Sequence, residues 1–309
     1  MKTLRYISAL VIALLGLSGC IRENIDDCET PVEINFLYFG NGIVDIFQDR
    51  VDSVLMYIYE MPSERLQQTV RISRDELEAF QGVKLRLNPG DYRIVCWGNA
   101  GEGSTVDLDG KRIMSSDYAA GSEPSGIEEL YHGSIDLSVP LTLRPVEEDM
   151  VYSASYIMMR VELLGFAYLG NPEVGGASVA SEAAADDATV RFIQGNHSAS
   201  IDFSNVPSTE VTDYVPVLGD HPDEGQSYLA DYLVPRFGND TGAQLKIVRN
   251  DTGETIFDRP LSDVMDELDI ELDERNEQMV NLRFRLSVSE GVITINVIGW
   301  NTEIVFPEL

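Results

Sequence analysis

The chain has 309 residues, with 22 lysines and arginines against 52 aspartates and glutamates, which gives a formal net charge of −30 at pH 7. A protein this acidic is repelled by nucleic acid and by anionic lipid headgroups, so neither is an expected partner. The length is enough for two domains of ordinary size.

Residues 1–19 have the three parts of a secretory signal peptide: a basic start at Lys2 and Arg5, a short apolar run, and small residues before Cys20. The run is shorter than the roughly 20 apolar residues of a membrane-spanning helix. Leu17-Ser18-Gly19-Cys20 resembles a bacterial lipobox, in which small residues precede the cleaved bond and a cysteine thiol receives the lipid. We therefore expect the mature chain to begin at Cys20 and to be held by acyl chains on a membrane outside the cytoplasm. The alternative is an ordinary signal peptide followed by an incidental cysteine.

Two cysteines remain if Cys20 carries lipid, namely Cys28 and Cys96. Because an oxidising compartment favours disulfides, we expect one bond between Cys28 and Cys96. Residues 20–30 are polar and acidic, which predicts a short spacer between the lipid and the folded body.

The first half of the chain alternates β-rich segments with turn signals. Ser73-Arg74-Asp75-Glu76 is a capping box and predicts a short helix. Alternating apolar residues predict a hairpin over residues 83–97, with a type II turn at Asn88-Pro89-Gly90-Asp91. Further segments are predicted as strands at residues 32–39, 51–60 and 139–143, and as a loop at residues 98–110.

A charged break at residues 145–150 separates the two halves, so we expect one domain over residues 31–148 and a second over residues 149–309. Residues 165–187 are rich in Gly, Ala and Ser and predict a long mobile loop. The i, i+3, i+4, i+7 spacing of Leu261, Val264, Met265 and Leu268 predicts a short amphipathic helix. Strands are predicted at residues 156–164, 189–193, 198–203, 228–234, 243–248, 254–257, 280–288 and 292–300.

Many short strands, frequent turns and only two short helices predict an all-β protein built from two β-sandwich domains in series. Trp97-Gly98-Asn99 in the first half has a counterpart in Gly299-Trp300-Asn301 near the end. This echo reflects either a repeated domain type or chance.

The residue types that carry catalysis do not form a familiar pattern. His132, His197 and His221 lie far apart, and none stands beside a nucleophile motif. The glycine-rich residues 98–103 lack the Lys-Ser/Thr of a phosphate-binding loop. An acidic run lacks the spacing of an EF-hand, so it predicts a solvated surface; it consists of Glu267, Asp269, Glu271, Asp273 and Glu274. We expect no catalytic, cofactor-binding or metal-binding residue and no small-molecule substrate.

Several segments together resemble one family. The start Cys20-Ile21-Arg22-Glu23-Asn24-Ile25-Asp26-Asp27-Cys28 is similar to the mature N-terminus of the FimB/Mfa-type fimbrial anchor lipoproteins. The run from Asn88-Pro89-Gly90-Asp91-Tyr92 to Trp97-Gly98-Asn99 resembles that family's Pro-Gly-x-Tyr…Trp-Gly segment. Leu130-Tyr131-His132-Gly133, Val139-Pro140-Leu141-Thr142 and Trp300 fit as well.

The resemblance implies two transthyretin-like β-sandwiches in series and a role in holding a fimbrium on the outer membrane. Cys20 would be the lipid anchor, Cys28 a structural cysteine, and the fimbrial (pilin) subunits the protein partners. It implies no catalytic residue.

Two other functions stay open. Polymerising stalk pilins and tip subunits share the lipobox and the fold, and in stalk pilins an Arg-directed protease removes the first strand; Arg50 lies at the matching place. A surface lipoprotein that binds glycan or peptide would instead expose a cluster of aromatic residues, for which the candidates are Tyr57, Tyr59, Tyr228 and Tyr232.

Overall fold

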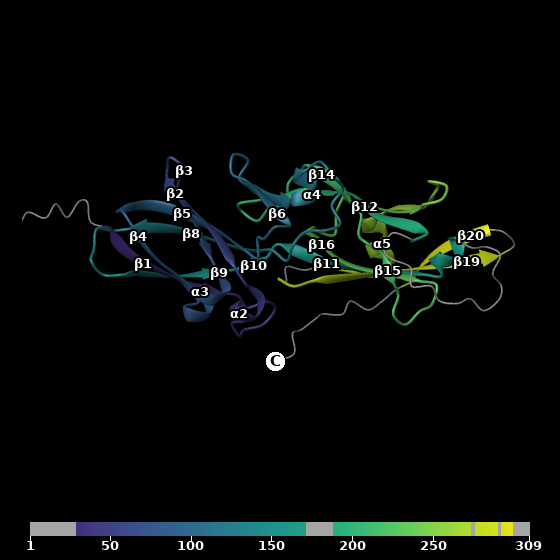
Figure 1. Ribbon diagram of the computed structural model, residues 1–309, viewed down its shortest axis with the longest axis horizontal. Coiled ribbons are helices and arrows are strands. Elements are labelled where there is room, and N and C mark those ends of the chain that lie inside the picture. The colour runs from purple at the N-terminus through teal and green to yellow at the C-terminus, as the bar shows by residue number, and fades with distance from the viewer. Residues whose placement is uncertain (1–28, 171–187, 273–275, 290–291, 299–309) are drawn as a thin grey trace, which may run out of the picture.

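The computed structural model describes residues 29–170, 188–272, 276–289 and 292–298 (Figure 1). Strands dominate, the helices are few and short, and the strands form sandwich domains, so the predicted all-β class is confirmed. The helical elements are α2 (Phe47–Arg50), α3 (Arg74–Ala79), α4 (Ser116–Ala119), η2 (Phe166–Gly170) and α5 (Leu261–Glu267).

The first sandwich consists of a three-stranded sheet, β4-β1-β9, facing a five-stranded sheet, β10-β8-β5-β2-β3. β1 lies between β4, which is antiparallel to it, and β9, which is parallel to it. The strand bounds are β1 (Thr30–Leu37), β2 (Val54–Met61), β3 (Arg65–Ile72), β4 (Gly82–Leu87), β5 (Gly90–Gly98), β8 (Tyr131–Val139), β9 (Val146–Val151) and β10 (Ser153–Ala154).

The second sandwich repeats this arrangement. Its first strand, β11, lies between antiparallel β16 and parallel β19, and the facing sheet has the order β14-β12-β17-β18. The strand bounds are β11 (Tyr156–Leu164), β12 (Val190–Ser198), β14 (Val211–Tyr214), β15 (Gly219–Asp220), β16 (Tyr228–Pro235), β17 (Gln244–Arg249), β18 (Thr255–Pro260), β19 (Met279–Ser289) and β20 (Val292–Ile298). Matching β11 to β1 and β19 to β9 makes the two strand orders the same, so the domain type is repeated. The finer transthyretin-like assignment stays a prediction.

A third, small sheet joins the two sandwiches. β6 (Ser104–Asp107) and β7 (Arg112–Ser115) belong to the connection between β5 and β8, and β7 pairs with β13 (Ser200–Asp202) of the second half. The same connection donates a hydrogen bond from Ile127 N–H to the Leu233 carbonyl, 2.9 Å away. The Ile127 side chain packs against all three hydrophobic clusters of the molecule. Figure 1 shows the two sandwiches arranged end to end along the long axis of the molecule.

The predicted hairpin over residues 83–97 is wrong. β4 pairs with β1, whereas β5 pairs with β2 and β8, so Asn88 and Pro89 connect two facing sheets and close no hairpin. The Tyr92 hydroxyl donates to the Asn88 carbonyl at 2.9 Å and pins this crossing. Local alternation sets where the strands lie, but the partner of each strand depends on distant residues.

The predicted break at residues 145–150 is a strand, and the predicted strand at residues 139–143 is mostly a loop. β8 ends at Val139, and β9 then takes the charged residues, with Glu147, Glu148 and Asp149 exposed on the sheet edge. The strand pairing therefore places the change of sandwich near Ser155 rather than between residues 148 and 149. Independent folding of the two domains stays a prediction.

Other local predictions are confirmed. Ser73 and Glu76 form the capping box of α3, and α5 buries Leu261, Val264 and Met265. The strands predicted at residues 243–248, 254–257, 280–288 and 292–300 correspond to β17, β18, β19 and β20. The loop predicted at residues 98–110 contains β6, and residues 171–187 of the other predicted loop lie outside the described residues, as does Trp300.

Candidate functional site

The predicted lipid site lies outside the described residues, but the structure shows where the chain enters the fold. Cys20 and Cys28 both precede Glu29, the first described residue. Thr30 is fully buried, and its hydroxyl donates to the Pro140 carbonyl at 2.7 Å. In the described part of the chain, no helix is both long and apolar enough to cross a membrane.

Cys96 is buried in the middle of the first core and has no disulfide partner among the described residues. It pairs with Gly133 on β8, whereas Thr30 pairs with Leu87 at the end where β5 begins. Cys96 is six residues farther along β5 than Gly90, about 20 Å at the usual rise per residue. Two extended residues from Thr30 to Cys28 reach only about 7 Å, and a disulfide needs Cα atoms within about 7 Å. The Cys28–Cys96 bond stays a prediction, because Cys28 is not described, but the position of Cys96 disfavours it.

β1 fills the groove between β4 and β9 completely. It has six register pairs with β4 and six with β9. The side chains of Val32, Ile34 and Phe36 alternate into the core with no exposed surface. Phe36 packs against Phe47 and Tyr152, with each pair of ring centroids 5.5 Å apart. The first strand is therefore part of the core of its own sandwich.

Arg50, the candidate processing residue, is held on two sides. Its guanidinium Nε lies 3.2 Å from Oε1 of Glu277, in the second sandwich. Its backbone carbonyl accepts a hydrogen bond from Asn99 Nδ2 at 2.8 Å, and the following residue, Val51, is buried. A protease needs both the side chain and an extended, accessible backbone, and neither is free here.

Glu277 is the centre of a clamp between the sandwiches, which we define as Tyr38, Asn41, Arg50 and Glu277. The Tyr38 hydroxyl donates to the Glu277 carboxylate at 3.2 Å. The Asn41 side chain binds both backbone groups of Glu277, at 2.8 and 3.1 Å. Burial, and then the Glu277 charge, raise the pKa of Tyr38 above its usual value. The clamp thus combines an ion pair with neutral hydrogen bonds at a partly buried junction.

A second polar cluster lies behind the clamp. The hydroxyls of Tyr131 and Tyr156 are 3.1 Å apart, and both donate to Oε1 of Glu129, at 2.5 and 2.9 Å. Burial raises the pKa of both phenols. The carboxylate satisfies buried hydroxyls of both sandwiches, so the cluster has a structural use.

The histidines also have structural partners. His132 Nε2 lies 3.0 Å from the Phe203 carbonyl and so links the first sandwich to the small joining sheet. His197 Nε2 lies 2.9 Å from the Pro235 carbonyl, and burial lowers its pKa to about 4. His221 is 3.6 Å from Glu162. The structure keeps the three histidines apart. No group of three His, Cys, Asp or Glu side chains among the described residues could hold a metal ion.

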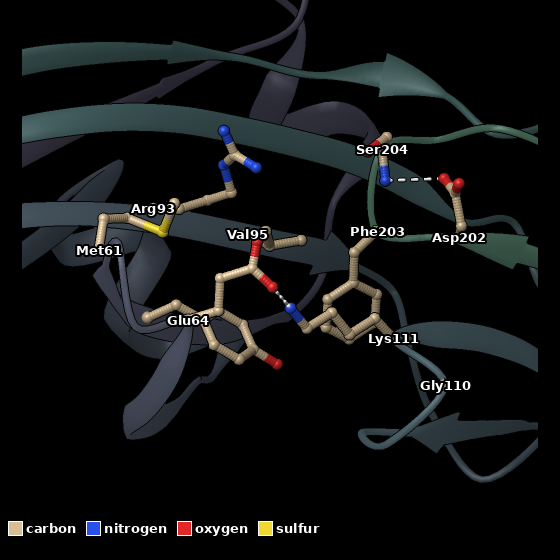
Figure 2. A pocket seen from close by; sticks show the side chains of 10 residues that line it. Met61, Glu64, Arg93, Val95, Gly110, Lys111, Asp202, Phe203 and Ser204 are labelled. Carbon is tan, nitrogen blue, oxygen red and sulfur yellow. Dashed lines mark hydrogen bonds and ion pairs between the residues drawn. The ribbon is translucent and has the colours of Figure 1, made fainter.

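A cleft that contains aromatic and charged residues lies beside the joining sheet (Figure 2). It has a volume of about 310 Å³ and runs from the β2–β3 turn to Phe203. Lys111 forms an ion pair with Glu64, which holds the pKa of that carboxyl below its usual value. Arg93 Nε lies 2.7 Å from Oδ1 of Asp136. Both of these cations are thus already paired.

The predicted aromatic face is absent at the four tyrosines that were candidates for it. All of them are at most 7 % exposed, and they are Tyr57, Tyr59, Tyr228 and Tyr232. Tyr57 stacks on Phe203 at 5.4 Å inside the junction. Tyr228 and Tyr232 lie in the core of the second sandwich. Tyr57 and Tyr59 lie on the face of β2 opposite to the core, where Phe203 and the joining sheet cover them.

One family model matches most of the chain. The family model of the fimbrillin-A associated anchor proteins Mfa1 and Mfa2 matches residues 25–306. The fimbrial anchor protein Mfa2 of Porphyromonas gingivalis has a similar structure, with a TM-score of 0.64, 12% identity, and coverage of 88% of this chain and 98% of that one. None of the curated proteins matches.

Two further structures are similar. A candidate adhesin from Bacteroides ovatus gives a TM-score of 0.62 at 18% identity and covers 91% of this chain and 96% of its own. A candidate polysaccharide-binding protein from Bacteroides thetaiotaomicron gives 0.61 at 14% identity, with 89% and 97% covered. At these identities the structural matches show a shared fold, while the family model spans nearly the whole sequence. The chain therefore belongs to the family of fimbrillin-A associated anchor proteins, and its role is that of a structural protein associated with fimbriae.

Proposed function

We propose that this protein is a non-enzymatic outer-membrane lipoprotein that anchors a fimbrium to the cell surface. Its lipid is attached at Cys20, and its partners are the outer membrane and the fimbrial subunits. The family and the lipobox support the anchor over an unrelated surface lipoprotein, and the buried tyrosines give no support to a glycan-binding face.

The observation that carries the proposal is the first strand seated in its own groove, with Arg50 held in the clamp. The lipid lies upstream of this strand, so cleavage after Arg50 would separate the lipid from the body unless the strand stayed bound. An anchor must keep that connection, whereas a stalk subunit must open its groove for the next subunit. The seated strand alone fits any uncut subunit, but the protected Arg50 favours an anchor over a stalk.

The end of the molecule at which the chain enters the fold supports the same role. β1 begins at the end of the first sandwich that lies farthest from the second sandwich, as Figure 1 shows. A tether at that end would place the first sandwich near the membrane and the second sandwich away from it. The anchor would then meet the fibre through its distal parts, while its own groove stays filled.

The test is to delete the gene and follow the fibres. We expect fibres of normal composition to be shed into the medium, and wild-type protein but not a Cys20→Ala variant to restore their attachment. Fibres that stay cell-bound at normal length would contradict the anchor. Complete loss of fibres would indicate a stalk subunit.

A further inference from the structure

The loop between β8 and β9, residues 140–145, exposes two leucines at the tip of the first sandwich. Leu143 is 80 % exposed and Leu141 is 46 % exposed, although both are large apolar side chains. Figure 1 shows this connection at the end opposite the second sandwich. Isolated exposed leucines are common, so their exposure alone does not indicate a partner.

The two leucines lie in a loop that contacts the first residues of the folded chain. The Thr30 hydroxyl donates to the Pro140 carbonyl at 2.7 Å and accepts from Thr142 N–H at 3.4 Å. The loop is therefore fixed to the residue at which the chain enters the first sandwich. Ten residues separate Thr30 from Cys20, so the tip stays within about 35 Å of a lipid on Cys20.

The charge of the loop suits a lipid surface better than the charge of the whole protein does. Arg144 is the single charged residue among residues 140–145, and it is exposed beside Leu143. Leucines at the headgroup boundary with a neighbouring arginine toward phosphate are the composition of interfacial segments. The acidic residues of β9 begin only at Glu147.

We propose that Leu141 and Leu143 insert into the outer leaflet of the bilayer to which the lipid is attached. This inference rests on the lipid tether of the proposed function, and it adds a second contact with the same membrane. The tether alone leaves the body free to rotate, whereas two contacts at one tip hold the long axis away from the membrane. The high local concentration imposed by the short tether lets a contact of only two leucines form.

The test uses the full-length lipidated protein in vesicles of phosphatidylcholine whose acyl chains are brominated, which quench nearby tryptophan. In a Leu143→Trp variant, we expect the added emission to be roughly halved relative to unbrominated vesicles. The matched control is Ile293→Trp on β20, an exposed apolar position at the far end of the molecule. Its added emission should not change.

The experiment distinguishes a failure of the inserted loop from a failure of the lipid tether. Co-flotation with the vesicles and equal emission of the Leu143→Trp variant in both lipids would overturn the inserted loop alone. Wild-type protein that does not float with the vesicles would overturn the tether and the inserted loop together. Flotation with quenching restricted to position 143 would support both.

Discussion

The two sandwiches share one strand order but differ in what joins their fifth and sixth strands. In the second sandwich, β17 and β18 are joined by a tight turn at residues 250–253. In the first, the equivalent strands β5 and β8 are joined by residues 99–130, which form β6, β7 and α4 and reach across to the second sandwich. The two domains thus share one strand order, but only the first has a long connection, residues 99–130, which we call the arm.

They differ again at the edge of the sheet that holds the first strand. β20 covers β19 in the second sandwich, whereas the corresponding strand of the first, β9, ends its sheet with three exposed carboxylates. Charged side chains on an open edge oppose pairing with another chain. The first sandwich therefore protects its edge by charge and the second by an added strand.

The largest effect should come from removing one core aromatic from each sandwich. Phe36→Ala and Phe284→Ala each empty a fully buried site, which costs about 3–5 kcal/mol of unfolding free energy. If the sandwiches unfold as separate units, differential scanning calorimetry will show two transitions, and each variant will lower only its own. Equal shifts of one common transition would show that the arm and the clamp make the molecule a single cooperative unit.

Alkaline pH should distinguish the sandwiches next. Burial raises the pKa of more phenols in or beside the first core than in the second; the former are Tyr38, Tyr57, Tyr59, Tyr92, Tyr131, Tyr152 and Tyr156, and the latter are Tyr214 and Tyr232. An unfolded tyrosine titrates near pH 10, below these folded values, so the stability from the neutral phenols is complete below about pH 10. That stability is lost as pH rises, by about 1.4 kcal/mol per phenol and pH unit.

The measurement compares melting temperatures at pH 8 and pH 11, and the first transition should fall farther than the second because more buried phenols titrate in it. Tyr152→Phe is a suitable control, because it removes a fully buried titrating hydroxyl and keeps the ring that fills the core. The variant should reduce the alkaline loss of the first transition. An unchanged loss would show that the buried phenols do not cause it.

A smaller effect is expected at the clamp. Glu277→Ala leaves the Tyr38 hydroxyl without its acceptor and Arg50 without its ion pair, which costs about 1–3 kcal/mol. Trypsin should then cut after Arg50 faster than in the wild-type protein, as N-terminal sequencing of the fragments would show. Glu123→Ala is the matched control, because Glu123 forms a more exposed pair, 3.9 Å from Arg191. Equal rates of cleavage in all three proteins would show that the clamp does not protect the bond after Arg50.

The smallest effect is expected for alkylation of the Cys96 thiol. Burial raises the pKa of the Cys96 thiol to about 12, so Cys96 should not react with an alkylating reagent in the folded protein at pH 8. After denaturation without reductant, its position in the first core predicts that it reacts as a free thiol. Its failure to react until a reductant is added would establish the disulfide and would show that the first strand is held differently.

Sequence reasoning worked where structure depends on neighbours in the chain. The capping box at Ser73, the helical spacing around Val264 and the alternation along β19 each predicted an element that the structure contains. It failed where partners are distant: the parallel pairing of β1 with β9 joins residues more than 100 apart, and nothing local distinguishes the crossing at Asn88 from a hairpin. A charged segment without apolar alternation predicts a break, whereas β9 is an edge strand whose charged side chains are exposed.

The candidate site shows the same division. The lipobox at Cys20 and the arginine between the first two strands are visible in the sequence, whereas the role of Arg50 depends on Glu277, 227 residues away. No local pattern marks such a partner. The tyrosines are visible as candidates too, but only the fold decides that they are buried.

The central claim is that the mature protein keeps its first strand and the lipid upstream of it. Mass spectrometry of the protein extracted from the outer membrane together with attached fibres tests this directly. We expect one chain that begins at an acylated Cys20 and continues uncut through Arg50 into Val51. A mature chain that begins at Val51, or an unmodified Cys20, would contradict the account.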